Sequence, residues 1–127
     1  MREHLVRIDG KLVWQPAPVT VAVIVGHNVG TVPTHDTLTI CDHIRPLLAE
    51  VFTVAEGGGN YREVGGTVIG EACTVLVGTV YGPRSALAGY LANVAQALDQ
   101  ESIGLVWNGD GNSLVFLRPS PFTVAGI

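Results

Sequence analysis

The sequence predicts an α+β domain in which two helices cover one face of an antiparallel sheet. Residues 19–26 form an almost continuous β-branched run, which is typical of a buried central strand. Apolar residues recur every three or four positions in two segments, 36–51 and 85–100, and this spacing predicts helices. The chain has 127 residues, of which 47% are hydrophobic, so it fits one compact domain with a substantial core.

The N-terminal third begins with a predicted hairpin over residues 4–14. Two short apolar runs, residues 5–8 and 11–14, flank an Asp9-Gly10 pair that suits a tight primed turn. The central strand at 19–26 follows, and we expect it to be covered on both faces. A loop from His27 to Pro33 then leads to the first helix.

The first helix is expected to begin at a capping residue, either Thr34 or Asp36. Pro46 must kink or restart it, because proline lacks the N–H that the helix needs. The apolar positions expected to face the core are Leu38, Cys41, Ile44, Leu48 and Val51.

After this helix, a short strand at 52–54 is expected to enter a glycine loop at 56–63. A long strand region, 64–80, follows, in which Gly65, Gly66 and Gly70 suggest a bulge or bend. Period-two alternation places Glu71 on one face of this strand, pointing toward apolar surroundings. Its companions on that face are Ile69, Cys73, Val75 and Val77.

The C-terminal third carries the clearest helix, residues 85–100, and then two strands, 103–107 and 113–117, joined by a hairpin loop at 108–112. The helix has one apolar stripe, formed by Leu87, Tyr90, Leu91, Val94 and Leu98.

The order strand, helix, strand, strand, helix, strand predicts a ferredoxin-like sandwich with β-hairpin additions at both ends. We expect a single domain over residues 1–127. It divides into an N-terminal hairpin extension at 1–17, a core at 18–118 and a tail at 119–127.

The charge balance excludes several classes of partner. The net charge is −4, so neither nucleic acid nor an anionic membrane is expected, whereas a cationic ligand would be attracted. Only 14% of residues are charged, which favours a homo-oligomer. The chain begins without a signal-like apolar run and has no stretch long enough to span a membrane, so we expect a cytoplasmic protein.

The spacing of metal-binding residue types predicts no metal site. Cys41 and Cys73 stand far apart, which argues against both a zinc knuckle and a disulfide framework. None of the four histidines has a partner at zinc-binding spacing. We therefore expect neither a metal nor another cofactor.

The richest stretch for ligand binding is Glu-Gly-Gly-Gly-Asn-Tyr-Arg-Glu, residues 56–63. Consecutive glycines let the backbone approach a ligand closely, and Glu71 beyond them is a carboxylate in an apolar strand. No Gly-Lys-Ser/Thr follows the glycines, and a strand rather than a helix comes next. Phosphate and dinucleotide loops are therefore excluded. The glycines could equally be a flexible connection, and Glu71 could reach water at a strand end.

His27 and Asn28 follow the central strand, at a strand end where ligands often bind. A loop histidine is also commonly just exposed, so both interpretations stay open.

From Tyr61-Arg62-Glu63 to Glu71, ten residues beyond the tyrosine, the chain resembles the bacteriophage S-adenosylmethionine-degrading enzymes, described as hydrolases and as lyases. The resemblance covers roughly residues 19–117 and includes the 74–77 strand, the 86–100 helix and the 101–107 strand. Its motifs are short. Some members carry paired acids where Ala72 follows Glu71 here, which leaves the register of the catalytic acid open.

The resemblance implies a ferredoxin-like subunit in a homotrimer with active sites between subunits. It implies a reaction in which the substrate carboxylate attacks its own γ-carbon, releasing methylthioadenosine and homoserine lactone. Glu71 and Tyr61 would bind and orient the substrate for catalysis. The other residues expected to bind substrate are Gly57, Gly58, Gly59, Asn60, Glu63, His27 and Asn28.

The sequence also fits two other classes of function. One is a non-catalytic module of the same fold that binds or senses a nucleotide or another small molecule. The other is an oligomeric structural protein without a ligand. Formation of methylthioadenosine from S-adenosylmethionine would separate the enzyme from both.

Overall fold

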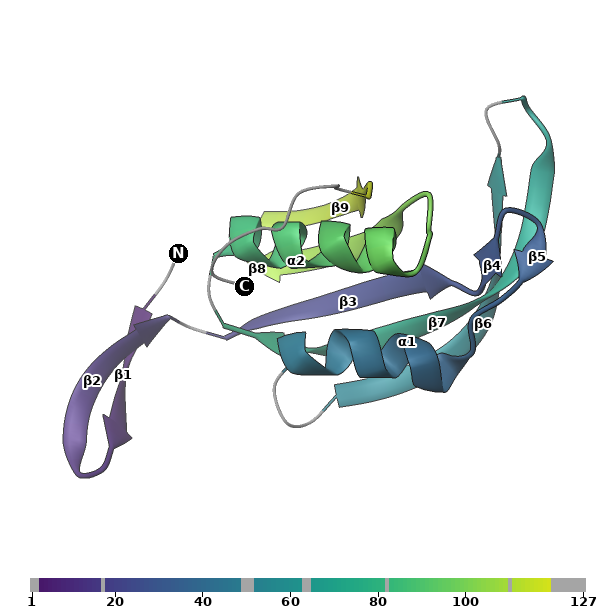
Figure 1. Ribbon diagram of the computed structural model, residues 1–127. Helices are drawn as coiled ribbons and strands as arrows, with labels where there is room; N and C mark the ends of the chain where they lie inside the picture. Colours follow the sequence, from purple (N-terminus) through teal and green to yellow (C-terminus); the bar gives the residue numbers. More distant parts are fainter. Residues whose placement is uncertain are drawn as a thin grey trace.

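The computed structural model describes residues 3–16, 18–48, 52–62, 65–81, 83–109 and 111–119. Its main feature is a five-stranded antiparallel sheet with two helices on one face, the α+β arrangement predicted from the sequence (Figure 1). In spatial order, the strands are β6 (Phe52–Arg62), β7 (Val68–Val80), β3 (Val19–Gly26), β8 (Ile103–Gly109) and β9 (Gly111–Leu117).

The connections follow the ferredoxin-like pattern. Along the chain the core elements run β3, α1, β6, β7, α2, β8, and β3 pairs antiparallel with both β7 and β8. The predicted central position of residues 19–26 is therefore confirmed. β9 extends the sheet beyond β8, which makes the sheet one strand wider than the basic pattern.

The first helix, α1 (Thr37–Ile44), begins at Asp36, one of the two predicted caps. The Asp36 carboxylate accepts a hydrogen bond of 2.8 Å from the Thr39 backbone N–H, which satisfies a free donor of the first turn. Pro46 lies in a short 3₁₀ helix, η1 (Arg45–Leu47), so the chain restarts at this proline as expected.

One member of the predicted apolar face of α1 points the other way. Leu38 is 75% exposed, whereas Ile40, which the periodicity did not select, is fully buried. Residues 40, 41 and 44 lie on one side of the helix, and at about 100° per residue position 38 falls outside that sector. Val51, also expected on this face, lies outside the described residues.

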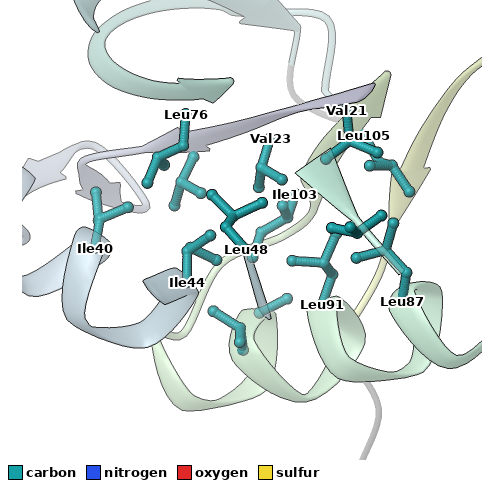
Figure 2. Close-up of a cluster of buried hydrophobic side chains, with 14 of the residues drawn as sticks. Val21, Val23, Ile40, Ile44, Leu48, Leu76, Leu87, Leu91, Ile103 and Leu105 are labelled. Atoms are coloured by element: carbon teal, nitrogen blue, oxygen red, sulfur yellow. The ribbon is translucent and has the colours of Figure 1, made fainter. Parts of the chain in front are cut away.

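The core fills the space between the helices and one face of the sheet (Figure 2). Burial along β3 alternates, with Val21, Val23 and Val25 buried and Ala22 and Ile24 only half-buried. The expectation that both faces of β3 are covered therefore does not hold within one chain, because both helices lie on the same side. The opposite sheet face stays accessible.

The second helix, α2 (Arg84–Ala97), presents the predicted stripe to the core. Leu87, Leu91, Val94 and, just beyond its end, Leu98 are all buried. Tyr90 is half-buried, and its hydroxyl donates to the His43 carbonyl over 2.7 Å, joining α2 to α1. Burial raises the pKa of this hydroxyl, so it remains a donor.

The glycine segment is a strand rather than the expected loop. Gly57, Gly58 and Gly59 lie within β6, opposite Cys73, Ala72 and Glu71 of β7. Glycine has a low strand propensity, but here an unbroken ladder of backbone partners on β7 outweighs it.

The glycines of the following region also differ from the expectation of a bulge or bend within the strand. Gly70 pairs in regular register with Asn60. Gly65 and Gly66 instead lie in the connection before β7, where Gly66 has a φ of +90°.

Two small hairpins complete the described chain. β1 (Glu3–Ile8) and β2 (Lys11–Pro16) form a separate sheet that projects away from the main one, ahead of the start of β3 (Figure 1). Their turn has positive φ at Asp9 (49°) and Gly10 (77°), which confirms the predicted primed turn. β4 (Asn28–Val29) and β5 (Val32–Pro33) form a hairpin within the segment expected to be a loop.

The C-terminal strands are longer than expected, since β8 and β9 pair as far as Gly109 and Gly111. Of the expected tail, residues 120–127 lie outside the described residues. No helix in the described ranges is long and apolar enough to cross a membrane.

Candidate functional site

A cleft of about 950 Å³ opens on the sheet face that the helices leave uncovered. Its floor includes Ile24 and Gly26 of β3 and Glu71 and Cys73 of β7. One side is formed by β6 and the other by the turn between α2 and β8, together with the end of β9. This volume is typical of small-molecule sites.

Glu71 lies in this cleft and is half-buried. One carboxylate oxygen, Oε2, accepts a hydrogen bond of 2.9 Å from the Asn28 backbone N–H. Glycines stand on both sides of it: Gly59 is its register partner on β6, and Gly26 lies beneath the carboxylate on β3. A Cβ on Gly26 would lie 2.5 Å from Oε1, so only glycine leaves this position open to the carboxylate.

Packing within the chain does not require glycine at Gly57 or Gly59, because a side chain there would not clash. A Cβ on Gly59 would meet nothing within 4 Å, and one on Gly57 would make only an ordinary contact, 3.8 Å from Cys73 Sγ. Gly59 and Asn60 line the cleft, whereas Gly57 and Gly58 are outside the described lining. The described chain therefore leaves room for a ligand along this strand, next to Glu71.

Of two further expected site residues, only Tyr61 lies within the described residues. Tyr61 lies in β6, paired with Ile69, two positions along from the Gly59–Glu71 pair. Glu63 lies outside the described residues.

His27, expected to bind substrate, is engaged on the helix-covered side of the sheet instead. Its backbone N–H donates to the Ala72 carbonyl over 3.0 Å, and its ring Nε2 lies 2.7 Å from Oγ1 of the fully buried Thr74. His27 is not among the described residues that line the cleft, whereas its neighbour Asn28 is.

The hydrogen bonds beyond Thr74 define which nitrogen of His27 carries the proton. Thr37 Oγ1 donates to a carboxylate oxygen of Glu56 and lies 3.1 Å from Thr74 Oγ1. A hydroxyl has one proton to donate, so Thr37 accepts from Thr74, and Thr74 in turn accepts from His27. His27 is thus a donor at Nε2 that ties the segment after β3 to β7 and α1.

The turn after α2 supplies cleft residues that were not predicted from the sequence. Asp99, Gln100 and Glu101 all line the cleft. Gln100 is only 6% exposed, and its side-chain N–H donates to the Asn28 carbonyl over 2.8 Å. Polar residues just after a helix normally indicate a solvated turn, so no sequence signal distinguished these from others.

The charges of the described cleft favour a ligand with both a cationic and an anionic group. Three carboxylates, those of Glu71, Asp99 and Glu101, line it together with the guanidinium of Arg118. Acidic groups held around a cleft attract cations, and arginine pairs readily with a carboxylate. Over the described ranges, no three His, Cys, Asp or Glu side chains are grouped so as to hold a metal ion.

No protein-family model matches the sequence, and no curated protein matches it. Solved structures do resemble the fold. A phage SAM lyase in complex with S-methyl-5'-thioadenosine aligns with a TM-score of 0.67 and 16% identity, over 84% of this chain and 94% of the other. The apo state of a phage SAM lyase aligns with a TM-score of 0.57 and 15% identity, over 82% and 91%. The resemblance seen in the sequence is therefore confirmed at the level of the fold.

Proposed function

We propose that this protein is an S-adenosylmethionine lyase, and that the cleft around Glu71 is its active site. The observation that carries the proposal is a half-buried carboxylate with a glycine on either side, in a small-molecule cleft. The likeness of the fold to a phage SAM lyase solved with S-methyl-5'-thioadenosine supports the choice of substrate.

In this reaction the protein forms no covalent bond with the substrate, because the nucleophile and the leaving group both belong to the substrate. A carboxylate oxygen of the methionine tail attacks the γ-carbon, and the Cγ–S bond breaks with its electron pair moving to sulfur. Methylthioadenosine leaves as a neutral thioether, and the tail closes to homoserine lactone without transferring a proton. Holding nucleophile and carbon together can be worth about 7–11 kcal/mol in favourable intramolecular cases. The site therefore acts mainly by positioning.

Electrostatics favour one of the two cationic groups of the substrate as the partner of Glu71. The sulfonium charge disappears as the Cγ–S bond breaks, so a carboxylate beside it would stabilise the ground state more than the transition state. The α-ammonium keeps its charge throughout the reaction. We therefore place Glu71 against the ammonium, where it orients the methionine tail without opposing the loss of charge on sulfur.

The remaining substrate contacts follow from the cleft and from the family resemblance. The bare backbone near Gly59 and Asn60 is available to the ribose or carboxylate. Tyr61 is proposed to orient the substrate, and Glu63 is proposed to bind it. His27 is proposed to act indirectly, through the position of its neighbours. Its ring is hydrogen-bonded to Thr74 and is not part of the described cleft lining.

We further propose a homotrimer whose subunits cover the open sheet face and complete the cleft between them. Large apolar side chains are exposed on that face: Val77 is 41%, Leu114 56% and Phe116 66% exposed. Phe116 also lines the cleft, so a neighbouring subunit seated there would lie close to the substrate. Light scattering of the wild type and of Phe116→Asp tests this, and a monomeric wild type would overturn it.

We place the reaction in the cytoplasm. Both cysteines of the chain, Cys41 and Cys73, are free thiols, as a reducing compartment would keep them.

The decisive assay is incubation of the protein with S-adenosylmethionine in H₂¹⁸O, followed by mass spectrometry. A lyase yields methylthioadenosine and a lactone, and later opening of the lactone places ¹⁸O in the carboxyl group. A hydrolase would place ¹⁸O on the γ-hydroxyl. If the melting temperature rises with methylthioadenosine but no product forms, the protein is a binding or sensing module instead.

A further inference from the structure

Asn28 is held at both of its backbone polar groups, although it lies in a short surface hairpin. Its N–H donates to Glu71 Oε2 over 2.9 Å, and its carbonyl accepts from Gln100 Nε2 over 2.8 Å. Gln100 comes from the turn after α2, 72 positions away in the sequence, and is 6% exposed. A buried side chain thus reaches across the cleft wall to the residue that contacts the candidate catalytic carboxylate.

The chemistry of the acceptors determines how the Gln100 amide is oriented. Its nitrogen lies 2.8 Å from the Asn28 carbonyl and 3.4 Å from that of Leu98. Carbonyls only accept hydrogen bonds, so the NH₂ end must face them. The same Leu98 carbonyl also accepts from His35 Nε2 over 2.6 Å, which joins the two segments a second time.

The preceding peptide plane is fixed as well. The His27 carbonyl, which shares a plane with the Asn28 N–H, accepts from the backbone N–H groups of Thr34 at 2.9 Å and His35 at 2.8 Å. Gln100 fixes the following plane, that of the Asn28 carbonyl. The Asn28 N–H lies in the preceding plane and points to Glu71, while Gln100 anchors this residue, and with it the β4–β5 hairpin, to the end of α2.

We infer that Gln100 is a positioning residue of the cleft, which keeps the Asn28 N–H on the Glu71 carboxylate. Without its donor, the β4–β5 hairpin loses a link to the turn after α2 and can shift as a unit, which moves the Asn28 N–H relative to the carboxylate. The structural part of this inference is independent of the reaction, whereas its effect on turnover rests on the proposed lyase function.

The test replaces Gln100 with methionine, which keeps the length of the side chain and removes the donor. Gln96→Met is the matched control, because Gln96 is exposed on the last turn of α2 and outside the described cleft lining. The Asn28 amide proton is followed by ¹⁵N-resolved NMR without ligand. Gln100→Met and Glu71→Gln should both move its resonance. In Gln100→Met its hydrogen exchange should quicken about 3- to 10-fold, as for loss of one hydrogen bond, and Gln96→Met should change neither.

If Gln100→Met does not fold, Gln100→Ala also removes the N–H donors and buries no charge. An Asn28 resonance and exchange rate equal to wild type in a folded variant would overturn the inference. In the activity assay, Gln100→Met should lower kcat/KM for S-adenosylmethionine about 3- to 10-fold at an unchanged CD spectrum. A wild type without activity would remove the proposed function alone, since the NMR result would still decide the role of Gln100.

Discussion

The carboxylate of Glu71 occupies the space in which a side chain at Gly26 would stand. A Cβ on Gly26 would lie 2.5 Å from Oε1 and 2.6 Å from Oε2, although the two residues are on different strands, β7 and β3. The glycine and the acid therefore depend on each other. Any residue other than glycine at position 26 would force the Glu71 carboxylate to move.

Glu71→Gln should lower kcat/KM about 10- to 100-fold. The neutral amide weakens the proposed hydrogen bond to the α-ammonium of the substrate, and a hydrogen bond to a charged group is worth about 1.5–3 kcal/mol. The neutral amide oxygen can still accept from Asn28, so the fold should be preserved. Glu56→Gln is the matched control, since Glu56 is exposed and bonded to Thr37, outside the described cleft lining. Methylthioadenosine release, measured by chromatography, checks both variants, and full activity in Glu71→Gln would remove this residue from the site.

Gly26→Ala should displace Glu71 and lower kcat/KM about tenfold or more, because the added methyl group overlaps the carboxylate. The unfolding free energy should fall by only about 0.5–1.5 kcal/mol, because the carboxylate is the end of a flexible side chain that can move aside and mainly loses its hydrogen bond with Asn28. Gly59→Ala is the control for stability, since a Cβ there meets nothing within 4 Å. Urea denaturation compares the two, and equal stability together with normal turnover in Gly26→Ala would contradict the described position of the carboxylate.

Cys73 should react with iodoacetamide while Cys41 does not. Burial raises the pKa of the Cys41 thiol, the main cause of its shift, which keeps it protonated and unreactive. Cys73 is half-buried and lines the cleft. Methylthioadenosine should slow its alkylation, as measured by mass spectrometry of peptides. Alkylation at the same rate with and without the ligand would place the ligand elsewhere.

Ile40→Ala should destabilise the protein by about 2–5 kcal/mol, the usual cost of truncating a fully buried aliphatic side chain. Leu38→Ala, on the same helix, should change stability little because Leu38 is 75% exposed. Chemical denaturation monitored by circular dichroism gives both values. The reverse order would mean that α1 is rotated from its described position.

Asp36→Ala should destabilise the protein at neutral pH, and the difference from wild type should shrink in acid. The hydrogen bond from the Thr39 backbone N–H lowers the pKa of Asp36 below its ordinary 3.8. The contribution of the ionised Asp36 carboxylate to the free energy of unfolding is therefore fully present above pH 3.8. It is lost as the pH falls through the lower folded-state pKa. Thermal melts between pH 2 and 7 test this prediction, and a difference that does not depend on pH would contradict it.

Much of the fold was predictable because it depends on local pattern. The β-branched run at Val19–Gly26 indicated the central strand, and the stripe on α2 indicated its buried face. Asp9-Gly10 and Asp36 were recognisable because turn and cap chemistry involve only neighbouring residues.

The expectations that failed are those in which a distant partner outweighs local preference. Gly57–Gly59 looked like a loop, but β7 supplies a strand partner for every position. Leu38 matched the spacing of the helix, yet the core lies on the side of Ile40.

For the site, the sequence alone determined that Glu71 lies on one face of a strand among apolar neighbours, because alternation along a strand is a local property. Only the tertiary structure brought Gly26, Asn28 and Gln100 around that carboxylate. These contacts join β3, β7 and the end of α2. Their geometry depends on how the sheet is ordered and where a helix ends, and no spacing along the chain encodes it.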